Sequence, residues 1–318
     1  MKVLVAGATG AIGRPVVTAL VRAGFQVFGM TRSESGLKGL REQGASGIVL
    51  DALDADAVMS ALQSLRPDAV IEELTSLPRK YTPVEMQKAA PIDRRVRLEG
   101  GRNVYTAART AGVRRYVVQS TGFFYAPGSG LASEDEPLAV NATPAVAASV
   151  QTYIQVEDRV LNDSDMPGVA LRYGFFYGPG TYQDPAEGSV TKQVRERKYP
   201  IIGAGSGVFS FVHVEDAASA TVSALEAAPG IYNVVDNNPS AMAVWLPAFA
   251  RWIGAPDPPR VTEAQAMQAA GPDSVYYALR LRGASNARAK RELGFAPRGL
   301  EWLTGSATEH RVTVEMNR

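Results

Sequence analysis

Residues 1–15 read MKVLVAGATGAIGRP, and this stretch decides the fold. An apolar run over residues 3–6 leads directly into Gly7, Gly10 and Gly13, after which apolar residues recur at helical spacing up to residue 21. We interpret this as a strand, a glycine turn and a helix. In such a turn the first glycine permits a tight bend, the second lets the backbone approach a pyrophosphate, and the third lets the helix lie against the sheet. Because a strand precedes the glycines and a helix follows them, the sequence predicts a dinucleotide-binding turn.

The end of the second expected strand, residues 26–31, indicates which coenzyme binds. An acidic residue at this place binds the ribose 2′-hydroxyl, whereas an arginine accommodates a 2′-phosphate. Arg32 stands here, so we expect NADP(H) in preference to NAD(H). Asp51, after the third expected strand, is a candidate acceptor for the adenine amino group. Ligands bind beyond the carboxyl ends of parallel strands, and the expected coenzyme contacts are Gly7, Thr9, Gly10, Ala11, Ile12, Gly13, Arg32, Asp51, Ala52, Leu74, Thr75, Tyr153, Tyr173 and Phe175.

Strand and helix patterns alternate over the first 175 or so residues. The apolar patterns predict strands at 3–6, 26–31, 47–50, 68–74, 115–119 and 169–173, and helices at 55–65, 94–111 and 150–161. A proline-rich loop is expected before residue 94. This alternation predicts an α/β fold with a Rossmann-type doubly wound parallel sheet.

Beyond residue 173 the pattern changes to a loop rich in glycine, proline and aromatic residues. We expect a helix at 190–198, a strand at 209–214, a helix at 215–227 and a strand at 231–235, followed by mostly helical chain. The predicted domains are therefore a Rossmann domain over 1–174, to which 209–235 returns, and a smaller, mostly helical C-terminal substrate lobe made of 175–208 and 236–318.

Composition excludes several classes of function. The 318 residues carry 33 basic and 32 acidic side chains, so no charge excess points to nucleic acid or an anionic membrane. There is no cysteine, which rules out disulfides and thiolate chemistry, and His213 and His310 alone argue against an imidazole-rich metal site. No apolar run is long enough to span a membrane, and the chain begins in a strand without a signal peptide. We expect a soluble cytoplasmic protein without a metal.

Several motifs in order resemble one enzyme family. They are GATGAIG at 7–13, RRYVVQST at 114–121, Leu171-Arg172 with YGPG at 177–180, FVHVED at 211–216, and SNA at 285–287 before ELG at 292–294. Together they resemble the extended short-chain dehydrogenase/reductase family, the NAD(P)-dependent epimerase/dehydratase group, over nearly the whole chain. The resemblance implies hydride chemistry in which a Ser or Thr and a Tyr polarise the reacting oxygen and a Lys follows the Tyr by four residues. It also implies a homodimer through helices 94–111 and 150–161.

The catalytic residues of that family carry over only in part. Thr121 stands where the family has its Ser or Thr. The segment 149–157 contains no YxxxK: either Tyr153 is the catalytic tyrosine and Glu157 replaces the lysine, or Glu157 is the family's glutamate and Ser149 and Tyr153 occupy the Tyr and Lys places. A tyrosine without a neighbouring ammonium stays neutral near pH 7 and can donate a proton. Thr121 and Tyr153 are therefore the candidate catalytic residues of a reduction. Arg94, Arg95 and Arg97 are given no role by the sequence.

Aromatic residues stand where many family members hold a sugar nucleotide. An anionic diphosphate has no obvious partner there, so we expect an uncharged, largely apolar substrate. The predicted function is reduction of a carbonyl or activated double bond by NADP(H). The alternatives are an epimerase, dehydratase or isomerase with a recycled coenzyme, and a non-catalytic NADP-binding sensor. The expected substrate contacts are Phe123, Phe124, Tyr125, Phe176, Tyr177 and Phe209.

Overall fold

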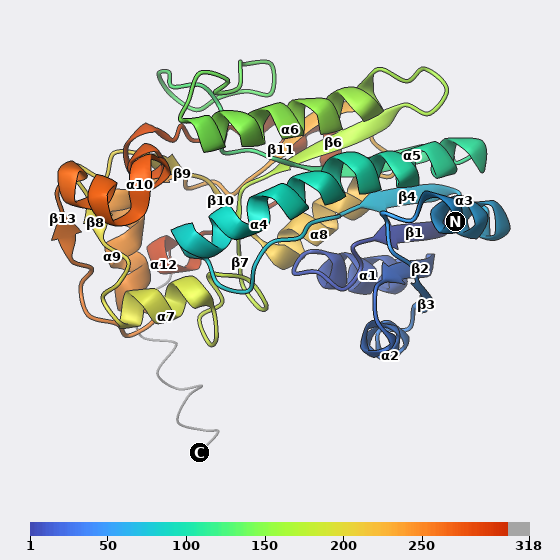
Figure 1. The fold of residues 1–318 in the computed structure, drawn as a ribbon, viewed down its shortest axis with the longest axis horizontal. Coiled ribbons are helices and arrows are strands. Elements are labelled where there is room, and N and C mark those ends of the chain that lie inside the picture. The colour runs from blue at the N-terminus through green and yellow to red at the C-terminus, as the bar shows by residue number, and fades with distance from the viewer. Residues whose placement is uncertain (305–318) are drawn as a thin grey trace.

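A seven-stranded sheet forms the centre of the protein in a computed structural model that describes residues 1–304 (Figure 1). The strand order is β11-β6-β5-β4-β1-β2-β3, and every neighbouring pair is parallel. The strands are β1 (Lys2–Ala6), β2 (Gln26–Thr31), β3 (Ser46–Val49), β4 (Ala69–Glu72), β5 (Arg115–Thr121), β6 (Gly168–Tyr173) and β11 (Gly230–Val234). The predicted Rossmann-type parallel sheet is confirmed, and the expected strand at 231–235 returns to it as β11.

Helices cover both faces of this sheet. On one face α1 (Gly13–Arg22) packs against α8 (Val214–Ser223), and on the other face lie α3 (Ala55–Leu65), α5 (Gly101–Thr110) and α6 (Pro144–Leu161). In β1 the side chains alternate between the faces: Val3 and Val5 join the core under α1, whereas Leu4 and Ala6 join the core under α3 and α5. All four are fully buried. A strand covered on both faces therefore reads as a continuous apolar run.

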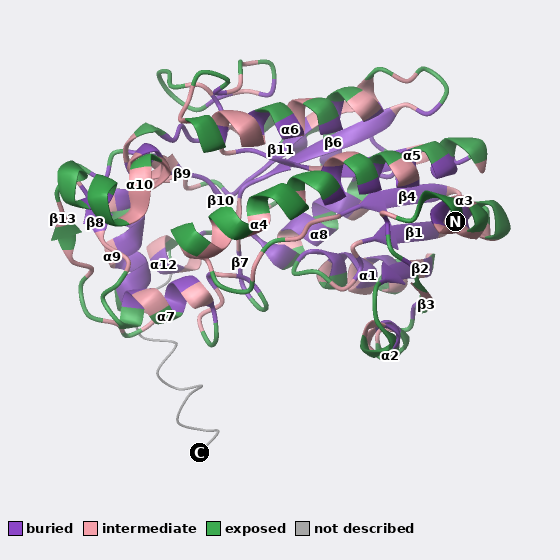
Figure 2. Cartoon of the chain, viewed as in Figure 1, coloured by how far each residue is buried: buried purple, intermediate pink, exposed green. Residues whose placement is uncertain are grey.

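A second core lies beyond the carboxyl ends of the strands. It is built around Trp245, Phe249 and Trp302, and the purple segments of α9 in Figure 2 belong to it. We propose that 175–208 and 236–304 form a lobe around this core and that 1–174 with 209–235 form the Rossmann domain. Apart from α8 and β11, the elements that follow residue 174 are β7 (Phe175–Tyr177), α7 (Ser189–Arg195), β8 (Ile201–Ile202), β9 (Val208–Phe209), β10 (Phe211–His213), β12 (Ser240–Ala241), α9 (Met242–Trp252), β13 (Arg260–Val261), α10 (Glu263–Arg280), α11 (Ala287–Leu293) and α12 (Glu301–Thr304).

Two expectations about local structure are wrong. The proline-containing segment before residue 94 is helical from residue 83: α4 (Pro83–Arg95) runs into the π-helix η1 (Val96–Gly100) and then into α5. Pro83 occupies the first helical turn, where proline removes no hydrogen bond, and the Thr82 hydroxyl caps the helix by accepting from the Glu85 amide. The expected strand at 209–214 is divided at Ser210 into β9, which pairs with β12, and β10, which pairs with β7. The Ser210 Oγ accepts from the Ala284 amide at 2.9 Å.

Within residues 1–304 no helix is both long and apolar enough to cross a bilayer. In the same residues no group of three or more His, Cys, Asp or Glu side chains is placed to hold a metal ion. His310 lies outside the described residues.

Candidate active site

The turn between β1 and α1 closes so tightly that two of its positions admit only glycine. A Cβ on Gly7, whose φ is +85°, would lie 2.3 Å from the Glu73 carbonyl oxygen, and a Cβ on Gly13 would lie 2.1 Å from the Gly7 carbonyl oxygen. The Gly10 amide donates to that same Gly7 oxygen at 3.0 Å. The glycine pattern therefore has the tight geometry that the sequence predicts.

The amino end of α1 fits a phosphate group. No side chain caps this helix at Ile12, and no acidic residue stands in its first turn. Gly10 and Ala11 are exposed at the turn. Uncapped amide groups and the helix dipole together attract an anion. The residues present thus fit the pyrophosphate of a dinucleotide coenzyme.

The ends of β2, β3 and β4 place the other expected coenzyme contacts. Arg32 directly follows β2 and is exposed, beside the Ser33 cap of α2 (Glu34–Glu42). Asp51 follows β3 and is also exposed, but one of its oxygens accepts from the Leu53 amide at 3.0 Å. Ala52 is buried. Leu74 and Thr75 follow β4 and are half-buried.

Thr121 and Tyr153 come from two elements that are joined by a buried hydrogen bond. Thr121 ends β5, and its Oγ1 is buried with no hydrogen-bond partner among residues 1–304. Tyr153 is half-buried on α6. One turn further along α6, Glu157 accepts from the Ser120 hydroxyl at 2.6 Å. An unpartnered buried hydroxyl at the carboxyl end of a strand is a group that a ligand could satisfy.

Glu157 is held by Arg172 and does not take the place of a catalytic lysine. Arg172 Nε and Nη2 donate to its two carboxylate oxygens, each at 2.7 Å, and both side chains are buried. Arg172 also donates to the Tyr125 hydroxyl at 2.9 Å and to the Glu134 carbonyl at 3.1 Å. This pairing is compatible with both alignments, because a carboxylate held by Arg172 supplies no positive charge next to Tyr153 in either of them. In the alignment that puts Ser149 at the tyrosine place, the Ser149 hydroxyl donates to the Ala145 carbonyl of its own helix at 3.0 Å.

A cluster of aromatic rings lies next to Tyr153. Phe123 and Phe175 stack with their centroids 4.1 Å apart, and Tyr277 of α10 approaches both rings. The Phe124 ring lies 6.2 Å from the Tyr153 ring. Sequence reasoning missed Tyr277, because no local pattern shows that α10 folds back over the loop after β5. We call this group the ring cluster: Phe123, Phe124, Tyr153, Phe175, Phe209 and Tyr277.

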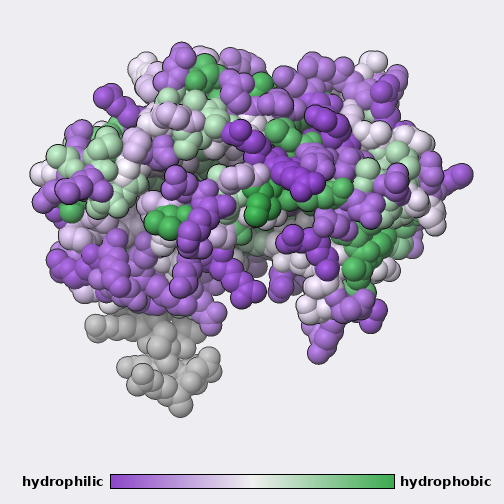
Figure 3. Space-filling view, viewed as in Figure 1, coloured by the Kyte–Doolittle hydropathy of each residue, from purple (hydrophilic) through white to green (hydrophobic). Residues whose placement is uncertain are grey.

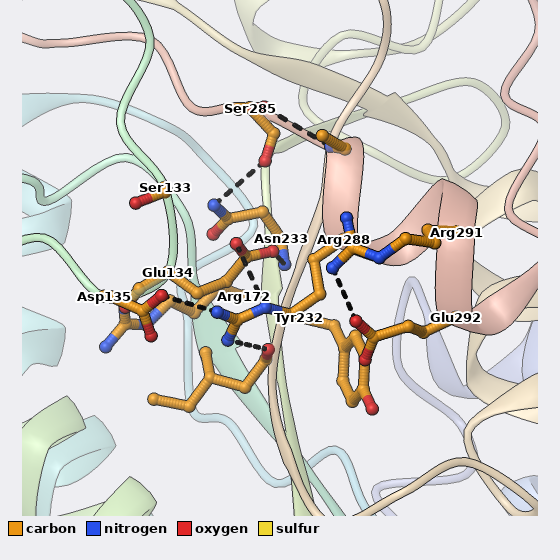
Figure 4. A network of polar contacts seen from close by, with 12 residues as sticks. Ser133, Glu134, Asp135, Arg172, Tyr232, Asn233, Ser285, Arg288, Arg291 and Glu292 are labelled. Atoms are coloured by element: carbon orange, nitrogen blue, oxygen red, sulfur yellow. Dashed lines mark hydrogen bonds and ion pairs between the residues drawn. The ribbon is translucent and has the colours of Figure 1, made fainter.

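Three of the expected substrate contacts lie outside the ring cluster. The Tyr125 hydroxyl donates to Asn233 at 2.6 Å within the polar network around Arg172, part of which Figure 4 shows. Tyr177 is fully buried and packs against the Trp302 ring at 4.9 Å. Phe176 packs on the α1 side of the sheet. These three side chains thus have structural contacts within the protein. The sequence alone does not distinguish them from the three expected substrate contacts that belong to the ring cluster.

Tyr173 also faces the core, where its hydroxyl contacts a buried acid. It donates to Glu73 at 3.1 Å and lies 2.7 Å from the Thr221 hydroxyl. Burial raises the pKa of Glu73 to about 8.

The neighbouring Glu72 points to the opposite face of the sheet, where Arg159 donates to it at 2.8 Å and Tyr116 donates as well. The two adjacent acids therefore do not share a proton.

We expect Glu73→Gln to flatten the pH dependence of the unfolding free energy. The folded Glu73 keeps its proton up to a pKa of about 8, whereas its ordinary pKa is 4.5. The folded state therefore binds more protons than the unfolded state in this interval, and wild-type stability falls as the pH rises through it. Relative to the wild type, the variant should gain at least about 1 kcal/mol between about pH 5 and about pH 8. Urea unfolding measures this, with exposed Glu42→Gln as control; parallel curves for Glu73→Gln and the wild type would contradict it.

Comparison with known proteins shows to which family this chain belongs. The sequence model of the NAD dependent epimerase/dehydratase family matches residues 3–234, so the chain belongs to this family. It is 41% identical, over 97% of its length and 100% of the relative, to a "3-diazoavenalumate denitrifying reductase" of Streptomyces sp.. It is 30% identical, over 93% of its length and 94% of the relative, to the UDP-glucose 4-epimerase of Mycolicibacterium smegmatis. The crystal structure of Thermus thermophilus UDP-glucose 4-epimerase in complex with NAD superposes with a TM-score of 0.72 at 26% identity, covering 99% of this chain and 98% of that one. The protein is thus an NAD(P)-dependent enzyme of the short-chain dehydrogenase/reductase type.

Proposed function

We propose that the protein is an NADP(H)-dependent reductase of a largely apolar, aromatic small molecule. The observation that carries this proposal is the ring cluster: Phe123 stacks on Phe175 and contacts Phe124, and the Phe124 ring lies 6.2 Å from the Tyr153 ring. Aromatic faces bind flat apolar groups and offer nothing to a diphosphate. This argues against a sugar nucleotide, which is the substrate in the name of the mycobacterial relative.

In such a reduction we assign separate roles to the coenzyme-binding turn, to Thr121 and to Tyr153. The glycine turn would hold the coenzyme, which would supply the hydride when bound. Thr121 and Tyr153 polarise the reacting carbonyl or activated double bond, and Tyr153 donates a proton from its phenol oxygen. Burial raises the pKa of Tyr153, so the phenol is neutral and can act as an acid near pH 7.

Coenzyme oxidation tests this function against its alternatives. The purified protein is mixed with NADPH and, in turn, an aryl ketone, an aryl enone and an arenediazonium salt, and the loss of NADPH absorbance is followed. Net oxidation with a reduced product supports the reductase. A product isomer without net oxidation would instead indicate an epimerase or isomerase, and tight NADPH binding without any turnover would indicate a sensor.

A second candidate electrophile is the diazo group. It is favoured by the relative of 41% identity over nearly the whole chain, whose name describes reductive loss of nitrogen from a diazo compound. For an arenediazonium ion the hydride provides the electron pair of a new C–H bond, while the C–N bond breaks and its pair leaves with N₂. This reaction consumes no proton, so it would not need Tyr153 as an acid.

Arg32→Ala should weaken NADPH binding much more than NADH binding. A charge-assisted pair with the 2′-phosphate contributes about 1.5–3 kcal/mol, or roughly tenfold to a hundredfold in Kd. NADH has no such phosphate, so its Kd should stay nearly unchanged. Calorimetric titration measures both constants, with exposed Arg22→Ala as control. Equal losses for the two coenzymes would remove Arg32 from the 2′-phosphate site.

The homodimer and the cytoplasmic location stay predictions. The expected dimer face comprises residues 94–111, which cover the end of α4, η1 and α5, and residues 150–161 of α6. In Figure 3 this side of the molecule is mostly hydrophilic with separate hydrophobic patches. Outside the expected face, α4 exposes Val84 and Ile92 on 58% and 57% of their surfaces.

A further inference from the structure

The π-helix between α4 and α5 carries a buried arginine into the candidate active site. η1 spans Val96–Gly100, and Arg97 within it is only 4% exposed. Its backbone carbonyl accepts from Arg159 Nη1 at 3.1 Å. Single-turn π-helices occur frequently at functional sites, since they alter which side chains the helix presents. Here the π-helix holds the charged Arg97 side chain inside the protein.

Arg97 is anchored by one acid and lies over the ring of Tyr153. Its Nε donates to Asp93 Oδ2 at 2.8 Å, and the other Asp93 oxygen accepts from the Ser76 amide at 2.6 Å, just beyond β4. The guanidinium carbon lies 5.0 Å from the centroid of the Tyr153 ring. A cation at this distance from an aromatic ring is attracted to it, most strongly where water is excluded. The contacts thus fix the guanidinium beside the phenol that we propose as the acid.

Within residues 1–304 the other groups around Tyr153 supply no second cation. Asp93 of α4 is a carboxylate whose charge acts on Tyr153, Tyr277 of α10 is a neutral phenol, and Phe124 is apolar. Glu157 on the same helix is paired with Arg172. Among residues 1–304 every lysine is exposed apart from Lys2, which donates to the Leu65 carbonyl.

We propose that Arg97 is the positioning residue that substitutes for the missing lysine of the family's Tyr-Lys pair. Its fixed charge orients the Tyr153 ring and stabilises the phenolate that remains after proton donation. This rests on the proposed function of Tyr153 as the acid. Unlike a lysine, a guanidinium stays charged throughout the working pH range, so the basic limb of the pH profile should report Tyr153 alone.

Kinetics with a reducible aryl ketone tests the role in turnover. Arg97→Met should lower kcat by about tenfold or more, with little change in NADPH affinity, and should move the basic limb of the kcat profile to higher pH. Arg97→Lys should restore most of the rate. In the Tyr153→Phe background the Arg97→Met change should have little further effect, since the two residues act as a unit. Exposed Arg94→Met, one turn earlier, is the matched control.

A titration that does not depend on turnover tests the same contact. With 3-fluorotyrosine placed at position 153, fluorine NMR follows the ionisation of that single phenol. Arg97→Met should raise its pKa, whereas Arg94→Met should leave it unchanged. An unchanged pKa in a folded Arg97→Met protein would overturn the proposal even if the enzyme reduces aryl ketones. A raised pKa in a protein without turnover would support the contact and overturn only the proposed function.

Discussion

Replacing Gly13 by valine should abolish coenzyme binding. The first atom of any side chain at this position would lie 2.1 Å from the Gly7 carbonyl oxygen and 2.9 Å from the backbone of Ala8. The turn must therefore open, and the amino end of α1 moves away from the pyrophosphate position. Because the phosphate contacts depend on that alignment, we expect the Kd for NADPH to rise by more than about a hundredfold, or about 2.7 kcal/mol, measured by calorimetry.

Two further variants test the same prediction if the Gly13→Val protein does not fold. A Cβ on Gly10 would lie 3.3 Å from the Gly7 oxygen, so Gly10→Ala should fold, while its methyl group occupies space that the pyrophosphate needs. Gly39→Ala in α2 meets nothing within 4 Å and should bind NADPH normally, with a gain of up to about 1 kcal/mol in stability. Wild-type affinity in a folded Gly10→Ala protein would show that the coenzyme does not bind at this turn.

The sequence predicts the sheet well because its central strands, such as β1, β4 and β6, are buried on both faces. Residues 26–31 and 55–65 were expected as a strand and a helix, and β2 and α3 have those bounds. Asp54 caps α3 by accepting from the Ala57 amide at 3.0 Å, as its position before the helix predicts. Sequence analysis missed α2, whose buried residues are only Leu37 and Leu40 and which contains two glycines. Such a helix is short and mostly polar, so it offers few apolar residues from which it could be recognised.

The candidate site is harder to predict, because its partners come from distant segments. The glycine turn is local, and its three positions can be assigned from spacing alone. Tyr277 joins Phe123 only after α10 has folded over the loop beyond β5. Arg97 is one of three arginines close together in sequence, and only the π-helix distinguishes it by burying its side chain while Arg94 and Arg95 stay exposed. Prolines at 83 and 91 conceal that helix from pattern analysis.

Tyr153→Phe should lower kcat for ketone reduction by about 10²–10³-fold, because a general acid contributes roughly that much. The ring and its contacts with Arg97 and Phe124 remain, so the Kd for NADPH and the thermal midpoint should change little. Stopped-flow measurement of NADPH oxidation gives kcat, and Tyr199→Phe, in the second core, serves as control.

The same variant separates the two candidate electrophiles. Reduction of an arenediazonium ion takes up hydride and releases N₂ without consuming a proton, so Tyr153→Phe should reduce that substrate at nearly the wild-type rate. Ketone reduction needs the phenol proton and should fail. If both substrates lose the same factor, Tyr153 acts by binding the substrate or orienting the ring cluster. If neither rate changes, the proton comes from another group. The next candidate to replace is then the buried Thr121 hydroxyl, which has no hydrogen-bond partner among residues 1–304.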